Sequence, residues 1–284
     1  MAMNPFKHVV ISTGADGQWK AWNVKAMGKV AMKGTGHNGA IARCEYHPGG
    51  AYFATGGMDQ LINFWNSDDG SLKLQLKHSI AVTSMSFHST GDFLLSGCSD
   101  GSVSLWDTNS NRCRSHLCRW NKIKNIHEGS IADCQILSYS NNAITASEDG
   151  QVTLWDLRTE SSQLILKQTH PIKNAKVATN GLVMGTTTKY GSELKLWDLR
   201  KLDGTTPLSV ANYAPQLICD FNFDSSRHMV AFALNNGQVN FWDVKSGTST
   251  VYPAHTASAV KVTWDIWGEY LISGDEEGNT FLWS

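Results

Sequence analysis

A histidine, a serine or threonine and an acidic residue recur along the chain in a fixed order and could form a catalytic site. Counted from the histidine, the hydroxyl residue follows after 18 residues and the acid after 22. A serine, a histidine and an aspartate make up a hydrolase triad, in which the histidine takes the proton of the attacking hydroxyl. The four sets, each with the tryptophan that closes it, are His37, Thr55, Asp59 and Trp65; His78, Ser96, Asp100 and Trp106; His127, Thr145, Asp149 and Trp155; and His255, Ser273, Glu277 and Trp283.

The repetition of this set favours a structural interpretation over a catalytic one. An enzyme does not need several identical catalytic centres in one chain. Buried polar groups must be hydrogen-bonded, and a network in which every member is satisfied makes its surroundings rigid. We therefore predict that the four sets are structural, that there are no catalytic residues and that the chain is not an enzyme.

The stretch Ile144–Arg158 shows which elements position one such set. Its two halves, Ile144–Ala146 and Val152–Trp155, are rich in β-branched and aromatic residues. Between them, Asp149 and Gly150 tolerate the positive φ that a two-residue hairpin turn requires. Two strands cannot bury enough apolar surface to be stable alone, so this hairpin must stack against copies of itself.

Seven tryptophans mark the copies and lie 41 to 49 residues apart. Most copies have Ser or Thr ten residues before the tryptophan, and four of the tryptophans are followed by Asp. A repeat of about 40–45 residues with a Trp-Asp ending is typical of a propeller blade. The tryptophans are Trp22, Trp65, Trp106, Trp155, Trp197, Trp242 and Trp283.

On these residues the chain resembles the WD40-repeat family over nearly its whole length. The resemblance implies an all-β, seven-bladed WD40-type β-propeller that forms a single domain over residues 1–284. It also implies that each set of His, Ser or Thr, Asp and Trp is a hydrogen-bonded tetrad that locks its blade. In such a tetrad the histidine binds the aspartate and the tryptophan binds the hydroxyl residue.

The first and last blades are predicted to be incomplete. Residues 1–7 are too few for a full strand before the first hairpin, His8–Trp22, so we expect blade one to lack its innermost strand. The sequence ends one residue after Trp283, so blade seven should lack its outermost strand. The sequence leaves open whether it is a piece of a longer chain and how the ring of blades closes.

Repeats five and six depart from the pattern. In repeat five, His170 lies 27 residues before Trp197, and Gly191 replaces the turn aspartate. In repeat six, Ala214 and Phe232 stand at the histidine and hydroxyl positions. Because neither repeat has a complete tetrad, we expect both to be less protected from hydrogen exchange than repeats two to four.

Composition narrows the classes of partner and compartment. A net charge of −1 provides no field that would attract nucleic acid or anionic lipid, and no apolar run is long enough to cross a membrane. The six cysteines form no CxxC pair, which favours a reducing compartment, the cytoplasm or the nucleus. Cys113, His116 and Cys118 cannot converge from one strand, so we predict neither a metal site nor a cofactor.

A basic segment between Trp106 and His127 is the one place where length and charge depart from the repeat together. It is longer than the corresponding segments of the other repeats, and no acid lies among its cations from Arg112 to Lys124. One interpretation is a solvated strand edge, blunted by its cations against aggregation. The other is a loop that binds an acidic or phosphorylated partner. The candidate residues are Arg112, Arg114, Arg119, Trp120, Lys122 and Lys124.

The residues just before the turn acids form a second candidate surface. Met58, Glu148 and Glu276 occupy this position in repeats two, four and seven. Their chemistry is mixed, which suits a peptide or a protein better than a nucleic acid, whose phosphates require clustered cations. We predict that these residues face partners on the loop-bearing face.

A third feature is the motif Trp-Asp-Leu-Arg, which ends at Arg158 and again at Arg200. The stretch Ile144–Arg158 resembles the box with which WD40 substrate receptors of cullin-RING ubiquitin ligases bind their adaptor. The second copy matches only at its end. The simpler alternative is that each arginine pairs with an aspartate of its blade.

Taken as a whole, the sequence predicts a non-catalytic scaffold that binds peptides or proteins through its loop-bearing face. The competing hypothesis is a substrate receptor of a cullin-RING ligase, in which Arg158 and Arg200 contact the adaptor. Neither the partner nor the oligomeric state follows from the sequence.

Overall fold

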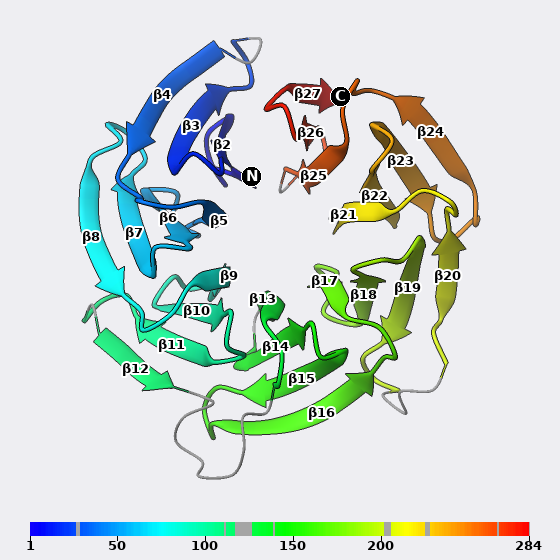
Figure 1. The fold of residues 1–284 in the computed structure, drawn as a ribbon, viewed down its shortest axis with the longest axis horizontal. Coiled ribbons are helices and arrows are strands. Elements are labelled where there is room, and N and C mark those ends of the chain that lie inside the picture. Colours follow the sequence, from blue (N-terminus) through cyan, green and yellow to red (C-terminus); the bar gives the residue numbers. More distant parts are fainter. Residues whose placement is uncertain are drawn as a thin grey trace. The chain divides into compact units, whose positions relative to one another are not determined.

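The structure is a computed structural model, and it describes residues 1–26, 29–110, 112–116, 127–138, 140–201, 206–224, 228–265 and 267–283, with the backbone alone for 112–116. These residues form 27 β-strands and contain no helix, so none of them belongs to a helix that could cross a membrane. The strands make seven small antiparallel sheets (Figure 1). One sheet corresponds to each repeat, which confirms the prediction of an all-β, seven-bladed β-propeller.

The sheets fall into two compact units, Met1–Pro171 with blades one to four and Ile172–Ser284 with blades five to seven. In every blade the strands pair in chain order, so that each strand is joined to the next by a hairpin. Tight turns of the Asp-Gly type between short strands predict this order.

The first unit contains four sheets of four strands each. Its strands are β1 (Ala2–Met3), β2 (Val9–Thr13), β3 (Gln18–Asn23) and β4 (Lys29–Thr35) in blade one; β5 (Ile41–Tyr46), β6 (Tyr52–Gly57), β7 (Leu61–Asn66) and β8 (Leu72–Lys77) in blade two; β9 (Val82–Phe87), β10 (Phe93–Cys98), β11 (Val103–Asp107) and β12 (Arg112–His116) in blade three; and β13 (Ile131–Ile136), β14 (Asn142–Ser147), β15 (Gln151–Asp156) and β16 (Ser161–Lys167) in blade four.

The second unit contains two sheets of four strands and one of three, among the residues described. Its strands are β17 (Ile172–Val177), β18 (Val183–Thr188), β19 (Glu193–Asp198) and β20 (Ser209–Asn212) in blade five; β21 (Ile218–Phe223), β22 (Met229–Leu234), β23 (Gln238–Asp243) and β24 (Ser249–Pro253) in blade six; and β25 (Ala259–Trp264), β26 (Leu271–Asp275) and β27 (Thr280–Trp283) in blade seven.

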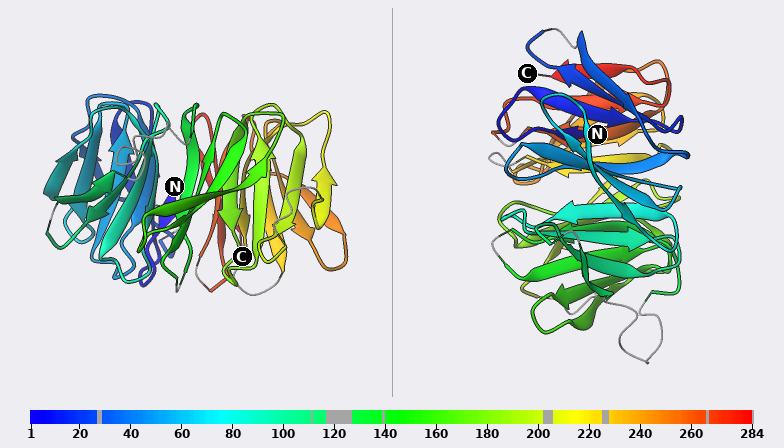
Figure 2. Two further views of the ribbon diagram at one scale, coloured as in Figure 1. Left: turned by 90° about the horizontal axis from the view of Figure 1, so that it is seen from below. Right: turned by 90° about the vertical axis from the view of Figure 1, so that its left-hand side faces the viewer.

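Within each unit, neighbouring sheets stack against one another (Figure 2). Apolar side chains fill the space between them. In the first unit the Trp19 ring of blade one lies 5.0 Å from the Phe53 ring and 5.4 Å from the Trp65 ring of blade two. In the second unit Phe221 and Phe232 of blade six are fully buried in a cluster with Leu196 of blade five. Stacking therefore supplies the apolar burial that a single hairpin lacks.

The first blade has an innermost strand, contrary to the prediction, although it is only two residues long. Strand β1 pairs antiparallel with β2. The reversal depends on Asn4, whose Oδ1 accepts the N–H groups of Phe6 and Lys7 at 2.9 Å. Asn4 Nδ2 also donates to the carbonyl of Gly50 at 3.0 Å, which anchors the turn to blade two. Blade seven has three strands among the described residues, β25, β26 and β27.

Candidate functional site: histidine networks and the loop-bearing face

In blade two, the predicted set forms one continuous chain of hydrogen bonds. The indole Nε1 of Trp65 donates to Thr55 Oγ1 at 2.8 Å, and Thr55 Oγ1 lies 2.7 Å from His37 Nε2. His37 Nδ1 lies 2.9 Å from both carboxylate oxygens of Asp59. The donors fit when the threonine hydroxyl donates to Nε2 and Nδ1–H donates to the carboxylate.

Blade four repeats this geometry. His127 Nε2 lies 2.8 Å from Thr145 Oγ1, and His127 Nδ1 lies 3.3 Å from Asp149 Oδ2. Asp149 also accepts the N–H groups of Glu128 at 3.0 Å and Gln151 at 2.8 Å. Burial acts to raise the pKa of Asp149, but the hydrogen bonds from His127 and from the two N–H groups outweigh it, and the pKa is lowered from the ordinary value.

These networks have the connectivity of a hydrolase triad, but their hydroxyl groups are not accessible to a substrate. The hydroxyl-bearing residues Thr55, Ser96, Thr145 and Ser273 have no exposed surface. In each case a tryptophan Nε1 also donates to the hydroxyl oxygen, at 2.7 to 3.0 Å. A nucleophile must reach its substrate, which these buried hydroxyl groups cannot do. Each is hydrogen-bonded to a histidine and to a tryptophan, so its role is to hold the strands together.

Blade three corrects the predicted role of Asp100. The histidine still meets its hydroxyl, with His78 Nε2 2.8 Å from Ser96 Oγ, but its Nδ1 lies 3.4 Å from Cys98 Sγ. Asp100 is exposed and accepts hydrogen bonds from Ser102. Cys98 stands two residues after Ser96, on the same side of the strand, and therefore occupies the position beside the imidazole.

Blade seven corrects the predicted role of Glu277 for the same reason. His255 Nδ1 lies 3.1 Å from Asp275 Oδ2, and Glu277 is exposed. Asp275 stands two residues after Ser273, just as Cys98 stands two after Ser96. Burial acts to raise the pKa of Asp275, but hydrogen bonds from Asn279 and His255 lower it overall.

The residue two positions after the hydroxyl residue therefore decides which group meets the histidine. In blade two this residue is Gly57, where an added Cβ would lie 2.8 Å from Asp59 Oδ1 and 3.0 Å from His37 Nδ1. The glycine leaves room for the turn aspartate to reach back to the ring. A Gly or Ser at this position, as against Cys or Asp, is the sequence signal that distinguishes the two arrangements.

Blades five and six lack the network for different reasons: the turn between β18 and β19 of blade five is one residue longer than that of blade four, and blade six has Phe232 at the hydroxyl position. Trp197 Nε1 donates to Thr186 Oγ1 at 2.9 Å, not to Thr187, and His170 is exposed. In blade six the Tyr213 ring packs 4.5 Å from Phe232, so two aromatic rings replace the histidine and the hydroxyl. Tyr213, rather than Ala214, thus takes the histidine position.

The three rim residues occupy equivalent places on the turns between second and third strands. The backbone N–H groups of Met58, Glu148 and Glu276 donate to the loop that enters the same blade, at 2.9, 2.9 and 3.1 Å. The Met58 side chain is half exposed, and Glu276 is exposed. Met58 and Glu276 thus combine a solvent-facing side chain with an anchored backbone, whereas Glu148 is partly buried.

The basic segment lies mostly outside the described residues, which exclude Arg119, Trp120, Lys122 and Lys124. Arg112 and Arg114 lie on β12, which pairs with β11, and their side chains are not described. The interpretation of this segment stays a prediction.

The two arginines of the Trp-Asp-Leu-Arg motifs are exposed beside an aspartate of their own blade. Arg158 Nη2 lies 3.9 Å from Asp156 Oδ2, and the Arg158 side chain is 74% exposed. Arg200 donates to both carboxylate oxygens of Asp198, at 2.9 and 2.8 Å. Hydrogen bonds from Arg200 lower the pKa of Asp198 to about 2. Both arginines therefore make the aspartate contact of the simpler alternative.

Comparison with known proteins agrees with this geometry. The family described as "WD domain, G-beta repeat" matches residues 28–66, 70–107 and 120–156. The chain belongs to the WD40-repeat family. No curated protein matched the chain. The three matches cover the repeats of blades two to four, whereas blades one, five, six and seven are unmatched.

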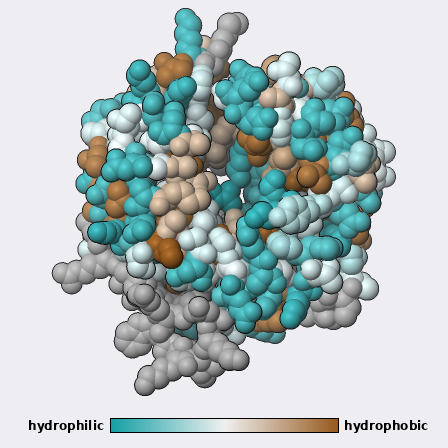
Figure 3. Space-filling view, in the orientation of Figure 1, coloured by the Kyte–Doolittle hydropathy of each residue, from teal (hydrophilic) through white to brown (hydrophobic). Residues whose placement is uncertain are grey.

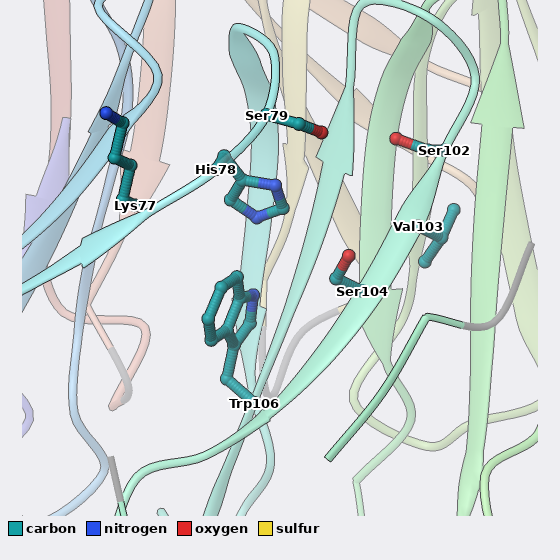
Figure 4. Close-up of a pocket in the computed structure, with 7 residues that line it drawn as sticks. All are labelled: Lys77, His78, Ser79, Ser102, Val103, Ser104 and Trp106. Atoms are coloured by element: carbon teal, nitrogen blue, oxygen red, sulfur yellow. The ribbon is translucent and has the colours of Figure 1, made fainter. Parts of the chain in front are cut away.

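One pocket in the described part of this WD40-repeat chain is smaller than most ligand pockets. A pocket of about 200 Å³ lies beside the network of blade three, lined by Lys77, His78, Ser79, Ser102, Val103, Ser104 and Trp106 (Figure 4). Ligand pockets usually measure ~300–1,000 Å³. No group of His, Cys, Asp and Glu suited to a metal ion occurs among the described residues.

The surface of the WD40-repeat chain is mixed in character. On the face drawn in Figure 3, hydrophilic residues prevail and hydrophobic residues form small, separate spots. WD40 propellers are typically non-catalytic scaffolds that bind other proteins. In such proteins, binding residues lie disproportionately on the loops that a rigid scaffold positions.

Proposed function

We propose that this chain is a non-catalytic scaffold that binds peptide or protein partners through its loop-bearing face. The observation that carries the proposal is a division of roles. The residue types that could do chemistry are buried in hydrogen-bond networks, whereas Met58 and Glu276 point to solvent from anchored turns.

The anchoring of these turns matters for affinity. Each rim residue is fixed by a backbone hydrogen bond to the loop that enters its blade. Ordering a loop on binding costs free energy, so turns that are ordered beforehand lose less of the interaction energy. A methionine adapts to irregular apolar surfaces, and the glutamates favour cationic groups on a partner.

The partner is a protein or peptide, and the basic segment would add a preference for acidic or phosphorylated ones. We place the chain in the cytoplasm or the nucleus, where its unpaired cysteines would stay reduced.

Affinity capture with rim variants tests the proposal. Replacing the exposed Met58 and Glu276 by Lys should abolish capture of partners while leaving thermal unfolding within ~0.5 kcal/mol of the parent, as is usual at exposed positions. A matched control carries Lys at Leu72 and Glu160, which are also exposed. Unchanged capture by the rim variant would exclude this face.

A ubiquitin-ligase receptor is the alternative, and the exposure of Arg158 and Arg200 favours it. Replacing both arginines by Ala should then remove an adaptor and a cullin from the captured proteins without affecting other partners. Capture that never contains an adaptor or a cullin, even with the parent, would exclude this alternative.

A further inference from the structure

The chain contains three Asn-Gly pairs, Asn38-Gly39, Asn180-Gly181 and Asn236-Gly237. In such a pair the backbone nitrogen of the glycine can attack the side-chain amide carbon of the asparagine. The amide leaves as ammonia with the proton of the attacking nitrogen, and water opens the resulting succinimide ring to aspartate or isoaspartate. The absence of a Cβ on the glycine favours the approach. The three pairs share this chemistry, so their surroundings in the fold decide which of them reacts.

The pair Asn180-Gly181 is held in a closed turn that occupies both reacting groups. Asn180 Oδ1 accepts the N–H of Leu182 at 2.9 Å, and the N–H of Gly181 donates to the carbonyl of Ala178 at 2.8 Å. Both groups must leave these partners before the attack. The turn must therefore open first, which slows the reaction.

The pair Asn236-Gly237 is restrained more strongly. Asn236 contacts Gln238 twice, since Oδ1 accepts its N–H at 3.2 Å and Nδ2 donates to its Oε1 at 2.9 Å. The N–H of Gly237 donates to the carbonyl of Leu234 at 3.1 Å. A Cβ added to Gly237 would lie 2.3 Å from the carbonyl oxygen of His255, so the glycine is also tightly packed.

The pair Asn38-Gly39, between β4 and β5, has none of these restraints. Asn38 is exposed, and in the described part of the chain neither its side chain nor the N–H of Gly39 has a hydrogen-bond partner. The backbone N–H of Asn38 donates to Asp59 Oδ2 at 2.9 Å. This bond holds the residue on its amino side and leaves both reacting groups free.

Blade four shows which restraint is missing from blade two. There, Ser147 Oγ donates to the carbonyl of Gly129 at 3.0 Å and holds the entering loop. The corresponding residues of blade two are Gly57 and Gly39, and a glycine has no hydroxyl to donate. The glycine that lets the turn aspartate reach the histidine therefore leaves the loop after this histidine less restrained.

We propose that Asn38 is a site of spontaneous modification, in which the Gly39 nitrogen displaces ammonia from the Asn38 amide and water opens the succinimide mainly to isoaspartate. Isoaspartate adds a methylene group to the main chain. This extension should loosen the following hydrogen bond, from the N–H of Met58 to the carbonyl of Ala40 at 2.9 Å. The modification itself does not depend on the scaffold function proposed above.

The aspartate product, by contrast, should leave the network intact. In blade four an acid, Glu128, already stands at the position that corresponds to Asn38. Its backbone N–H donates to Asp149 Oδ2 at 3.0 Å, just as that of Asn38 donates to Asp59. Asn38→Asp therefore provides a control that has the new charge without the added methylene group.

Mass spectrometry of proteolytic peptides tests the site. During incubation of the folded 284-residue chain at neutral pH, the peptide containing Asn38 should convert at least about tenfold faster than those containing Asn180 and Asn236, because each hydrogen bond that must open raises the barrier. In denaturant, the three pairs should convert at similar rates. Equal rates in the folded chain, or a faster rate at Asn180 or Asn236, would overturn the proposal.

Two variants test the cause. Gly39→Ala should slow conversion of Asn38 about tenfold or more. It should fold, because the nearest atom to an added Cβ, the backbone nitrogen of Asp59, lies 3.4 Å away. Gly57→Ser should also slow conversion, because it restores the hydroxyl of blade four. A parent-like rate in Gly39→Ala would exclude attack by the Gly39 nitrogen.

Hydrogen exchange tests the structural effect. The amide of Met58 should exchange faster in the chain that contains isoaspartate than in Asn38→Asp. The amide of Glu148, at the corresponding place in blade four, serves as the internal control and should not change. Equal exchange of Met58 in the two chains would contradict the proposed loosening of the turn.

Discussion

At the scale of single residues, His37, His127 and His255 use both ring nitrogens, one beside a hydroxyl and one beside a carboxylate. The three rings are completely buried. A buried imidazole that loses one partner keeps the desolvation cost of the unpaired nitrogen, which makes the carboxylate the sensitive member of each network.

Asp149→Ala should lower the free energy of unfolding by about 2–3 kcal/mol, because it removes a charge-assisted hydrogen bond and leaves His127 Nδ1 without its partner. The lowered pKa of Asp149 adds a pH dependence. The stabilisation by the carboxylate is present above the unfolded pKa of about 3.9 and is lost as the pH falls through the lower folded value.

Urea unfolding of the parent and of Asp149→Asn at pH 6 and pH 3 measures both effects. The asparagine variant should lose less stability between the two pH values than the parent does. Equal stability of Asp149→Ala and the parent at pH 6 would contradict the structural role of the network.

In blade seven, Asp275→Ala should destabilise by about 2–3 kcal/mol, whereas Glu277→Ala should change stability by less than ~0.5 kcal/mol. Asp275 contacts the buried His255, and Glu277 is exposed. Thermal unfolding measures the stability of the two variants, whose substituted residues lie only two positions apart. The opposite order of stabilities would restore Glu277 to the network.

At the scale of elements, the blades differ in how they lock their second and third strands. Blade five keeps only the contact between Trp197 and Thr186, whereas blade six replaces the polar network by the packed rings of Tyr213 and Phe232. Replacing buried polar networks by well-packed apolar groups is often neutral or stabilising. Blades five and six both lack a complete tetrad in the sequence, but they should therefore differ in local stability.

Hydrogen exchange should separate them. Amides of Thr186–Trp197 in blade five should exchange faster than those of Ile144–Trp155 in blade four, while Ala231–Trp242 in blade six should be as protected as blade four. Mass spectrometry of peptides from the exchanging chain provides the measurement. Equal protection of all three would show that sheet stacking alone sets local stability.

Polar contacts also join the first strands of blades two, three and four. Arg43 on β5 pairs with Asp133 on β13, and Glu45 Oε2 accepts the N–H of Phe87 on β9 at 3.2 Å. Burial raises the pKa of Glu45 to about 8, against the weaker effects of the Phe87 N–H and of Arg43. The folded chain therefore holds a proton on Glu45 that the unfolded chain releases near pH 4.3.

It follows that Glu45 weakens folding as the pH rises from about 4.3 through about 8. Glu45→Gln keeps the acceptor for Phe87 without the charge, so it should become increasingly stable relative to the parent over this range. Denaturant unfolding at pH 5, 7 and 9 measures the difference, with the exposed Glu160→Gln as control. A difference that does not grow with pH would contradict the burial of a neutral Glu45.

At the scale of the whole molecule, the net charge is −1, yet the part of the basic segment from Arg112 to Lys124 concentrates arginine and lysine without an acid. Local cations that cannot be neutralised within their own segment are available to a partner. Trp120 adds an aromatic residue of the type enriched at binding hot spots.

Replacing Arg119, Trp120 and Lys122 by Ala should therefore abolish capture of an acidic or phosphorylated partner while thermal unfolding stays the same. Capture by the parent should weaken as salt rises, because exposed charges are screened over ~10 Å at 0.1 M salt. Titration at several salt concentrations checks both. If the triple variant retains every partner, the segment is a solvated edge.

The sequence by itself determines the number of blades and most of their strands. Hairpin turns and closing tryptophans such as Trp65 and Trp155 are local signals, because a tight turn fixes the pairing of the strands on either side of it. The tetrads of blades two and four follow from the same register, since their turn aspartates stand behind a glycine or a serine.

Tertiary structure decided the rest. Which group meets His78 or His255 depends on side chains that share one face of a strand, so Cys98 and Asp275 displace the acids that regular spacing selects. Strand β1 forms because Asn4 binds Gly50 of another blade, a contact that no local pattern encodes.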